Sequence, residues 1–296
     1  MAGKLPKPGR ISLSPMLSYR GKLCGDLTVA CFDENEFMVF GSGAAQEMHR
    51  RWFESHLDKF DVNYKNRSDE FHGISIAGPN SRKVLEKIVR DNVTNEKFKF
   101  RDSRRMFVGG VPAIINRISF TGELGYEIYV APHYQIKLYE ELMEAGKEFN
   151  IKPFGGRALM SMRLEKNWGA WTLDYRPDFT AKETGLDMFI NWDKDFIGKE
   201  KAKSENSSNK LTPLIVETND IDVTSNEAVM NGDQSIGYVT SGGFAHFVNK
   251  SVAFTFIDQN KIKSENKIQI EINGDLFNCS VIKEPLYDPS GQKMRS

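Results

Sequence analysis

The sequence has few cysteines and no long run of apolar residues. Three of its 296 residues are cysteine, namely Cys24, Cys31 and Cys279, and no two of them form a Cys-x-x-Cys pair. A sparse, odd set of cysteines argues against a disulfide framework and indicates a reducing compartment. No apolar stretch reaches the length of a membrane span, and residues 1–8 lack the apolar core of a signal peptide. We therefore expect a soluble, cytoplasmic protein with no membrane partner.

The chain also lacks an excess of charge of one sign. Forty basic residues balance forty acidic residues, so the formal net charge at pH 7 is zero. The chain therefore has no strong general positive field that would attract nucleic acid, and only a local basic patch would be compatible with its composition. Its five histidines form no His-Glu-x-x-His motif and stand at no ligand spacing from a cysteine. The sequence therefore predicts neither a nucleic-acid partner nor a metal site.

The first two-thirds of the chain mix strand and helix patterns. Hydrophobic residues make up 40% of the chain, which is enough for a sizeable core and for two or three lobes. Apolar spacing predicts a hairpin of residues 27–32 and 36–40, and helices over residues 44–57 and 132–149. Residues 1–20 look irregular because Pro6, Pro8 and Pro15 prevent regular pairing.

The segment Gly41-Ser-Gly43 stands between the expected hairpin and the helix that follows it. A strand, a Gly-x-Gly turn and a helix in this order are typical of dinucleotide-binding sites. Gln46, however, occupies the position of the third glycine, and no series of parallel βαβ units follows. We therefore interpret the segment as an ordinary strand-to-helix turn with Ser42 as the helix N-cap.

The composition changes near residue 200. Lys201 to Lys210 is polar and is expected to be a linker or exposed loop. Beyond it the pattern predicts almost only strands, with hairpin turns at Asn231-Gly232 and Asn273-Gly274. We therefore expect an α+β body over residues 1–200 and a small β-barrel over residues 210–296.

The stretch from Phe120 to Val130 combines a glycine-containing turn with a strand. Gly122 and Gly125 allow the backbone to bend or another group to come close. After them, alternation places Glu127 on the strand face opposite to Tyr126 and Ile128. On these residues alone, Glu127 is either a solvated side chain on a hairpin or a carboxylate held in place for binding.

Six segments, in this order along the chain, resemble the glycine-cleavage T-protein (aminomethyltransferase) family. They are Gly21–Val29, Ile76–Asn80, Phe120–Ile128, Arg157–Lys166, Asp195–Lys199 and Thr240–Phe244. Two further segments, residues 9–17 and 164–171, are more similar to the tetrahydrofolate-binding C-terminal half of dimethylglycine and sarcosine dehydrogenases. The resemblance implies a T-protein-like arrangement of three lobes, with mixed α/β lobes and a C-terminal β-barrel.

One departure concerns the start of the chain. The family module has a further stretch before the segment that matches residues 4–10, and the dehydrogenases carry an FAD domain before that. The first lobe is therefore expected to be incomplete at its N-terminus. The chain would then be a split gene product that works with a partner, a fragment, or a shortened family member.

The resemblance also implies site residues. Glu127 matches the glutamate that binds the pterin ring, whose ring N–H and amine are two parallel donors for one carboxylate. Arg157 matches an arginine of the folate and substrate site, and Asp26 matches the family's essential aspartate. The alternatives are a solvated charge at a helix start for Arg157 and a turn-closing side chain for Asp26.

Two aromatic residues belong to the same expected site. Phe120 stands where the family usually has tyrosine, so one possible hydrogen bond to the folate or the substrate is missing. Tyr287, in Glu284-Pro-Leu-Tyr287, corresponds to a tyrosine that closes the T-protein site. We count both with Glu127 and Arg157 as candidate folate-binding residues, and we take Asp26 as the candidate catalytic residue.

The expected function is tetrahydrofolate-dependent transfer of a one-carbon unit from a methylated glycine derivative such as dimethylglycine or sarcosine. A carboxylate beside the folate would orient the amine, handle its proton and stabilise developing positive charge. The alternative is a non-catalytic folate-binding module, or a fragment that needs a dehydrogenase partner chain. FAD is expected only where such a partner supplies it.

Overall fold

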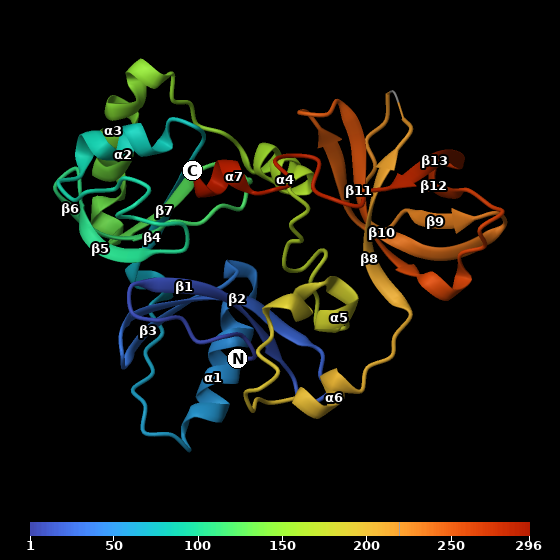
Figure 1. Ribbon diagram of the computed structural model, residues 1–296, viewed down its shortest axis with the longest axis horizontal. Helices are drawn as coiled ribbons and strands as arrows, with labels where there is room; N and C mark the ends of the chain where they lie inside the picture. Colours follow the sequence, from blue (N-terminus) through green and yellow to red (C-terminus); the bar gives the residue numbers. More distant parts are fainter. Residues whose placement is uncertain (219) are drawn as a thin grey trace. The chain divides into compact units, whose positions relative to one another are not determined.

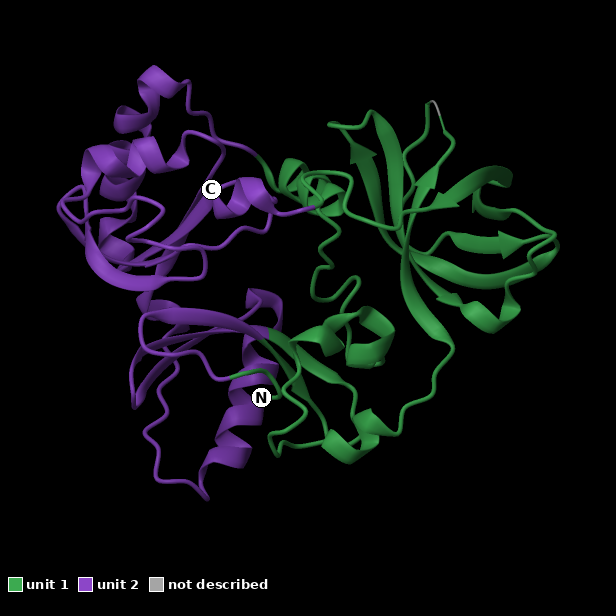
Figure 2. Cartoon of the chain, in the orientation of Figure 1, with its two compact units in different colours: residues 1–4, 14–26, 155–289 green, residues 5–13, 27–154, 290–296 purple. Residues whose placement is uncertain are grey.

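The computed structural model describes residues 1–218 and 220–296 (Figure 1). The chain forms two compact units, coloured green and purple in Figure 2. Unit 1 contains residues 1–4, 14–26 and 155–289, and unit 2 contains residues 5–13, 27–154 and 290–296. Each unit gathers separate stretches of chain, whereas the expected boundaries 1–200 and 210–296 follow sequence order. Those boundaries stay a prediction.

Unit 2 is built around a four-stranded antiparallel sheet. Its strand order is β4-β7-β6-β5, and the strands are β4 (His72–Ala77), β5 (Ser103–Val108), β6 (Val111–Asn116) and β7 (Gly125–Val130). Helices α2 (Ser81–Ile88) and α3 (Gln135–Gly146) contribute Val84, Leu85, Leu138 and Leu142 to its core. On β7, Tyr126, Ile128 and Val130 are fully buried in this core. The alternation therefore turns Glu127 and Tyr129 to the opposite face, as the sequence predicts.

The glycines of the turn before β7 have the two uses that the sequence predicts. Gly122 has a φ of 87°, in the left-handed region that favours glycine. A Cβ on Gly125 would lie 3.1 Å from the carbonyl oxygen of Ile118, so this position needs the close approach that glycine allows.

A three-stranded sheet of order β1-β2-β3 contains β1 (Arg10–Leu17), β2 (Leu23–Asp33) and β3 (Glu36–Phe40). The antiparallel pairing of β2 with β3 confirms the predicted hairpin. The prediction that residues 1–20 are irregular is wrong for residues 10–17, which form β1 and include Pro15. Proline is tolerated there because β1 is at the edge of the sheet, where a missing N–H breaks no ladder.

Helix α1 (Gln46–Leu57) begins after a short 3₁₀ turn, Gly43–Ala45. The prediction that Ser42 caps this helix is wrong, because Ala45 occupies the N-cap position of α1 and the Ser42 side chain makes no capping hydrogen bond. The turn is glycine-rich for a packing reason. A Cβ on Gly41 would lie 2.6 Å from Cδ2 of Leu27, so the glycine lets the chain pass close to β2.

Unit 1 contains a closed β-barrel of order β10-β11-β8-β13-β12-β9. Its strands are β8 (Asn209–Val216), β9 (Ala228–Asn231), β10 (Gln234–Ala245), β11 (Lys250–Asp258), β12 (Ile268–Ile272) and β13 (Asp275–Val281). Both predicted Asn-Gly turns join neighbouring strands, and at Asn273-Gly274 both residues have positive φ (53° and 93°), as a type I′ turn requires. The expected α+β fold with a C-terminal barrel is confirmed.

The remaining helices are short. Unit 1 has α4 (Gly156–Glu165), α5 (Ala181–Thr184) and α6 (Lys199–Lys203), and unit 2 ends with α7 (Gln292–Arg295). The predicted linker over residues 201–210 is partly wrong, because its first residues belong to α6 and its last two belong to β8. Lysine, glutamate and alanine are good helix formers, which explains why this polar stretch is helical.

Candidate functional site

Asp26 is a half-buried carboxylate on β2. Its neighbours Gly25 and Leu27 point to the other, buried side of the strand. Burial raises the pKa of Asp26 from 3.8 to about 7. A hydrogen bond from the residue's own backbone N–H acts in the opposite direction and lowers the pKa. Within residues 1–218 and 220–296, no other residue donates a hydrogen bond to this carboxylate. Asp26 can therefore accept or donate a proton near neutral pH.

The segment after α4 supports the start of β2 within unit 1. The backbone N–H of Leu23 donates to the carbonyl oxygen of Phe179 at 2.8 Å. On the same segment, Tyr175 is buried and its hydroxyl accepts a hydrogen bond from the Gly169 N–H at 3.1 Å. Burial raises the pKa of Tyr175, and the charges of Asp174 and Asp26 raise it further. Tyr175 is therefore a neutral, fixed neighbour of Asp26.

Asp174 links α4, the segment that follows it and β10 within unit 1. This residue was not identified from the sequence. Its side chain is fully buried and pairs with Arg163 of α4 at 2.5 Å. The other carboxylate oxygen accepts hydrogen bonds from Thr240 (2.5 Å) and Ser241 (2.7 Å) on β10. No motif could have identified it, because its partners are distant in sequence. The contacts hold the segment that carries Tyr175 against both α4 and the barrel.

Arg157 and Tyr287 lie toward opposite ends of α4. Arg157 is exposed in the first turn of the helix and, in the part of the chain that the structure describes, forms no ion pair. Tyr287 is buried, and its backbone N–H donates to the carbonyl oxygen of Glu165 at 3.0 Å. Its ring meets Phe247 edge-on at 4.9 Å. Eight residues of helix separate Arg157 from Glu165, about 12 Å along the axis.

Glu127 lies half-buried on β7 and forms a pair with Tyr129 on the same face. The Tyr129 hydroxyl donates to Oε2 of Glu127 at 2.6 Å. Burial raises the pKa of Glu127, whereas this hydrogen bond lowers it. Across the sheet, Glu127 stands opposite Ser75 on β4 and Asn116 on β6.

Tyr129 also lines a pocket of about 400 Å³ within unit 2. Its ring packs on Phe40 with centroids 4.6 Å apart. Six aromatic side chains line the pocket: Phe37, Phe40, Phe53, Tyr64, Phe71 and Tyr129. No carboxylate lines it among the described residues. The aromatic walls suit a planar ring, whereas of the Glu127–Tyr129 pair only Tyr129 lines this pocket.

Phe120 lies in the turn between β6 and β7 and is half-buried. The turn is closed by a hydrogen bond from the Gly122 N–H to the Ser119 hydroxyl at 3.0 Å. Phe120 has no polar atom to offer a ligand, so any contribution that it makes to binding is through its ring. Phe120 and Glu127 belong to unit 2, whereas the other three predicted site residues belong to unit 1.

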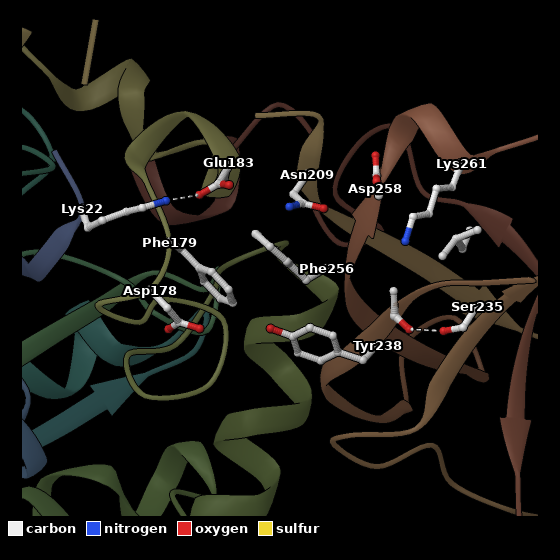
Figure 3. A pocket seen from close by; sticks show the side chains of 12 residues that line it. Lys22, Asp178, Phe179, Glu183, Asn209, Ser235, Tyr238, Phe256, Asp258 and Lys261 are labelled. Carbon is white, nitrogen blue, oxygen red and sulfur yellow. Dashed lines mark hydrogen bonds and ion pairs between the residues drawn. The ribbon is translucent and has the colours of Figure 1, made fainter. Parts of the chain in front are cut away.

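A second pocket, of about 560 Å³, lies within unit 1 and contains none of the predicted site residues (Figure 3). Phe179 and Phe256 stack in its wall with centroids 3.9 Å apart. Lys22 and Glu183, labelled at one side of the view, form an ion pair at 3.6 Å. Five charged side chains of both signs line this pocket, namely Lys22, Asp178, Glu183, Asp258 and Lys261.

Two features are absent from the described residues, 1–218 and 220–296. None of their helices combines the length and apolar character needed to cross a membrane. No group of three or more histidine, cysteine, aspartate or glutamate side chains among them is arranged to hold a metal ion.

Comparison with curated proteins finds relatives of two kinds. Human mitochondrial dimethylglycine dehydrogenase is 34% identical over 293 residues, which cover 96% of this chain and 34% of that protein. The aminomethyltransferase of Thermoanaerobacter pseudethanolicus is 28% identical over 292 residues, which cover 97% of this chain and 78% of that protein. The chain thus spans about a third of the length of the mammalian dehydrogenases that it matches.

Solved structures and family models agree with these relatives. Aminomethyltransferase T of the glycine cleavage system from Bartonella henselae matches 96% of this chain and 78% of its own, with a TM-score of 0.84 and 21% identity, which shows the fold. The family model of the GCVT N-terminal domain matches residues 1–194, and that of the glycine cleavage T-protein C-terminal barrel domain matches residues 209–288. The resemblance read from the motifs is therefore confirmed, and the relatives are named as enzymes. The chain belongs to the glycine cleavage T-protein family.

Proposed function

We propose that the protein is a tetrahydrofolate-dependent transferase that takes its one-carbon unit from an N-methylated glycine derivative such as dimethylglycine or sarcosine. The family uses tetrahydrofolate, and relatives are named aminomethyltransferases, which supports the general reaction. The choice of donor is supported by the name of the dimethylglycine dehydrogenases.

The main observation in support of the proposal is the raised pKa of Asp26 and the lack of hydrogen bonds from other residues to its carboxylate in the described structure. Its pKa is raised to about 7, and in the described structure no other residue donates a hydrogen bond to its carboxylate. A carboxyl group with these properties can take a proton from an amine and can stabilise a neighbouring cation. A purely structural aspartate would instead have its oxygens occupied by partners, as Asp174 has.

The remaining candidate residues are assigned to binding. Tetrahydrofolate, when bound, supplies the nitrogen that accepts the one-carbon unit. Glu127 would accept the paired N–H donors of the pterin ring, and Arg157, exposed and free of ion pairs, would meet an anionic tail. The ring of Phe120 and the fixed ring of Tyr287 would provide apolar contact.

The oxidation that releases the one-carbon unit is assigned to a part that lies outside this sequence. We propose an FAD-dependent dehydrogenase subunit or domain as the partner, because the dimethylglycine dehydrogenases are about three times as long as the matching chain. The chain would receive the unit as an iminium or as an amine-bound methylene.

Calorimetric titration with tetrahydrofolate, combined with a transfer assay, tests the proposal. The assay would generate the donor from dimethylglycine with a separate FAD-dependent dehydrogenase and measure methylenetetrahydrofolate. The substitution Asp26→Asn is expected to lower the transfer rate by about 10²- to 10⁴-fold while leaving folate binding nearly intact. Asp33→Asn, at the exposed end of the same strand, is the matched control and should change neither quantity.

Two outcomes would contradict the proposal. Unchanged transfer by Asp26→Asn would remove Asp26 from the chemistry. Binding of tetrahydrofolate with no transfer by the wild-type chain, at any dehydrogenase concentration, would favour the non-catalytic folate-binding module.

A further inference from the structure

The hydrogen bond between Tyr129 and Glu127 leaves most of the Glu127 carboxylate available. Tyr129 occupies one acceptor position on Oε2, at 2.6 Å. A carboxylate has about four such positions on its two oxygens. No further donor to Glu127 is found in residues 1–218 and 220–296. Glu127 is therefore a carboxylate with about one in four acceptor positions filled, whose orientation is already determined by one strong bond.

The ring of Tyr129 is held on two sides, which determines where its hydroxyl lies. Phe40 of β3 packs on it at 4.6 Å with the ring planes 39° apart. On β4, Gly73 stands directly opposite Tyr129. A Cβ at position 73 would lie 3.0 Å from Cε1 of Tyr129, so the ring lies over the space that glycine leaves open.

Tyr129 is suited to remain a donor. Burial, first, and the charge of Glu127, second, raise the pKa of the Tyr129 hydroxyl well above its usual range. It therefore keeps its proton at neutral pH. The hydrogen bond from Tyr129 in turn lowers the pKa of Glu127 and so opposes burial, which raises that pKa.

Other titratable groups do not explain the ionisation state of Glu127. The residues opposite it on β4 and β6 are Ser75 and Asn116, which do not ionise. The charged or titratable residues that line the pocket beside Tyr129 are His49, Arg50, Tyr64, Lys65 and Arg67. Three of these are cations paired with glutamates: Arg50 with Glu47 and Glu54, and both Lys65 and Arg67 with Glu70.

We propose that Tyr129 is a positioning residue, whose hydroxyl holds Oε2 of Glu127 so that the carboxylate is presented, ionised, to the two N–H donors of a pterin-type ring. This inference rests on the proposed function. Tyr129 would not itself contact the reacting atoms, and its effect on the ligand would pass entirely through Glu127.

Calorimetric titration of Tyr129→Phe with tetrahydrofolate between pH 6 and pH 9 tests this role. Binding at pH 7 is expected to weaken about tenfold, the range of a hydrogen bond to a charged group. The loss should shrink as the pH rises, because a higher pH restores the ionised carboxylate. Tyr139→Phe, a solvent-exposed tyrosine on α3, is the matched control and should bind as the wild type does.

A double-mutant cycle separates positioning from direct contact. In a Glu127→Ala background, which has no acceptor for the Tyr129 hydroxyl, Tyr129→Phe should have no further effect on binding. An equal loss in both backgrounds would mean that Tyr129 contacts the ligand or only maintains the fold, and it would overturn the inference. Gly73→Ala, which displaces the ring and keeps the hydroxyl, should reproduce part of the loss and should likewise have no effect in the Glu127→Ala background.

A ligand-free measurement distinguishes failure of this inference from failure of the proposed function. The ionisation of Glu127 can be followed through its side-chain ¹³C resonance, assigned with Glu127→Gln. Tyr129→Phe should raise the midpoint by about one pH unit. An unchanged midpoint would overturn the inference even if tetrahydrofolate binds. A raised midpoint in a chain that does not bind tetrahydrofolate would contradict the proposed function alone.

Discussion

At the residue scale, the property that suits Asp26 to catalysis also reduces the stability of the fold. Its pKa is about 7 in the folded chain and close to 3.8 when exposed, so the folded state prefers the protonated carboxyl group. The stabilising contribution is therefore complete below about pH 4 and is lost as the pH rises through 7. Above pH 7 the fold contains a poorly solvated negative charge.

The substitution Asp26→Asn should therefore stabilise the protein in a pH-dependent way. We expect a gain of about 4 kcal/mol in the free energy of unfolding at pH 8 and less than about 1 kcal/mol at pH 4. Urea denaturation at the two pH values measures this difference, with Asp33→Asn as the control. An equal gain at both pH values would show that burial of charge is not the cause.

At the scale of elements, Asp174 is the point where α4, the segment after it and β10 are joined. Both charges of its ion pair with Arg163 are buried, with side chains 0% and 1% exposed. Such a pair adds little net stability over apolar residues of the same size, but removal of one partner leaves an uncompensated buried charge. Here the remaining guanidinium would lie over the ring of Phe254 inside unit 1.

Asp174→Ala is expected to destabilise the protein by about 3–5 kcal/mol. The control is Asp178→Ala, because Asp178 also pairs with an arginine but is 61% exposed; its loss should cost at most about 1 kcal/mol. Thermal and urea unfolding of the two variants make the comparison. A small loss for Asp174→Ala would mean that water enters and solvates Arg163.

At the scale of the whole molecule, ligand binding should raise the free energy of unfolding. A ligand that binds the folded chain alone, at 100 times its dissociation constant, raises the free energy of unfolding by about 2.7 kcal/mol. We expect this effect from tetrahydrofolate, and less of it in Glu127→Ala. A nicotinamide nucleotide is the control, since the turn at Gly41 is explained by packing against Leu27. Equal stabilisation by the nucleotide would contradict folate specificity.

Several features of this protein followed from the sequence because they depend on neighbouring residues. Alternation on β7 separated Glu127 and Tyr129 from the buried side chains, and Asn273-Gly274 determined a hairpin turn through its own backbone preferences. The order of six motifs was enough to identify the family. Asp26, Glu127, Arg157 and Phe120 came from the same motifs, whereas Tyr287 came from the separate segment Glu284-Pro-Leu-Tyr287. The roles of all five remain predictions.

Other features were decided by contacts between residues far apart in the chain. Pro15 is tolerated in a strand because that strand is at a sheet edge. The order of the strands in a sheet cannot be predicted from the local sequence pattern. Asp174 meets Thr240 across 66 positions, and Phe40 reaches Tyr129 across 89. Burial of Asp26 and Glu127, which shifts their pKa values, likewise exists only in the folded chain. The sequence by itself therefore determined the family and the chemical groups, whereas the tertiary structure decided their surroundings, since desolvation and long-range pairing depend on the fold.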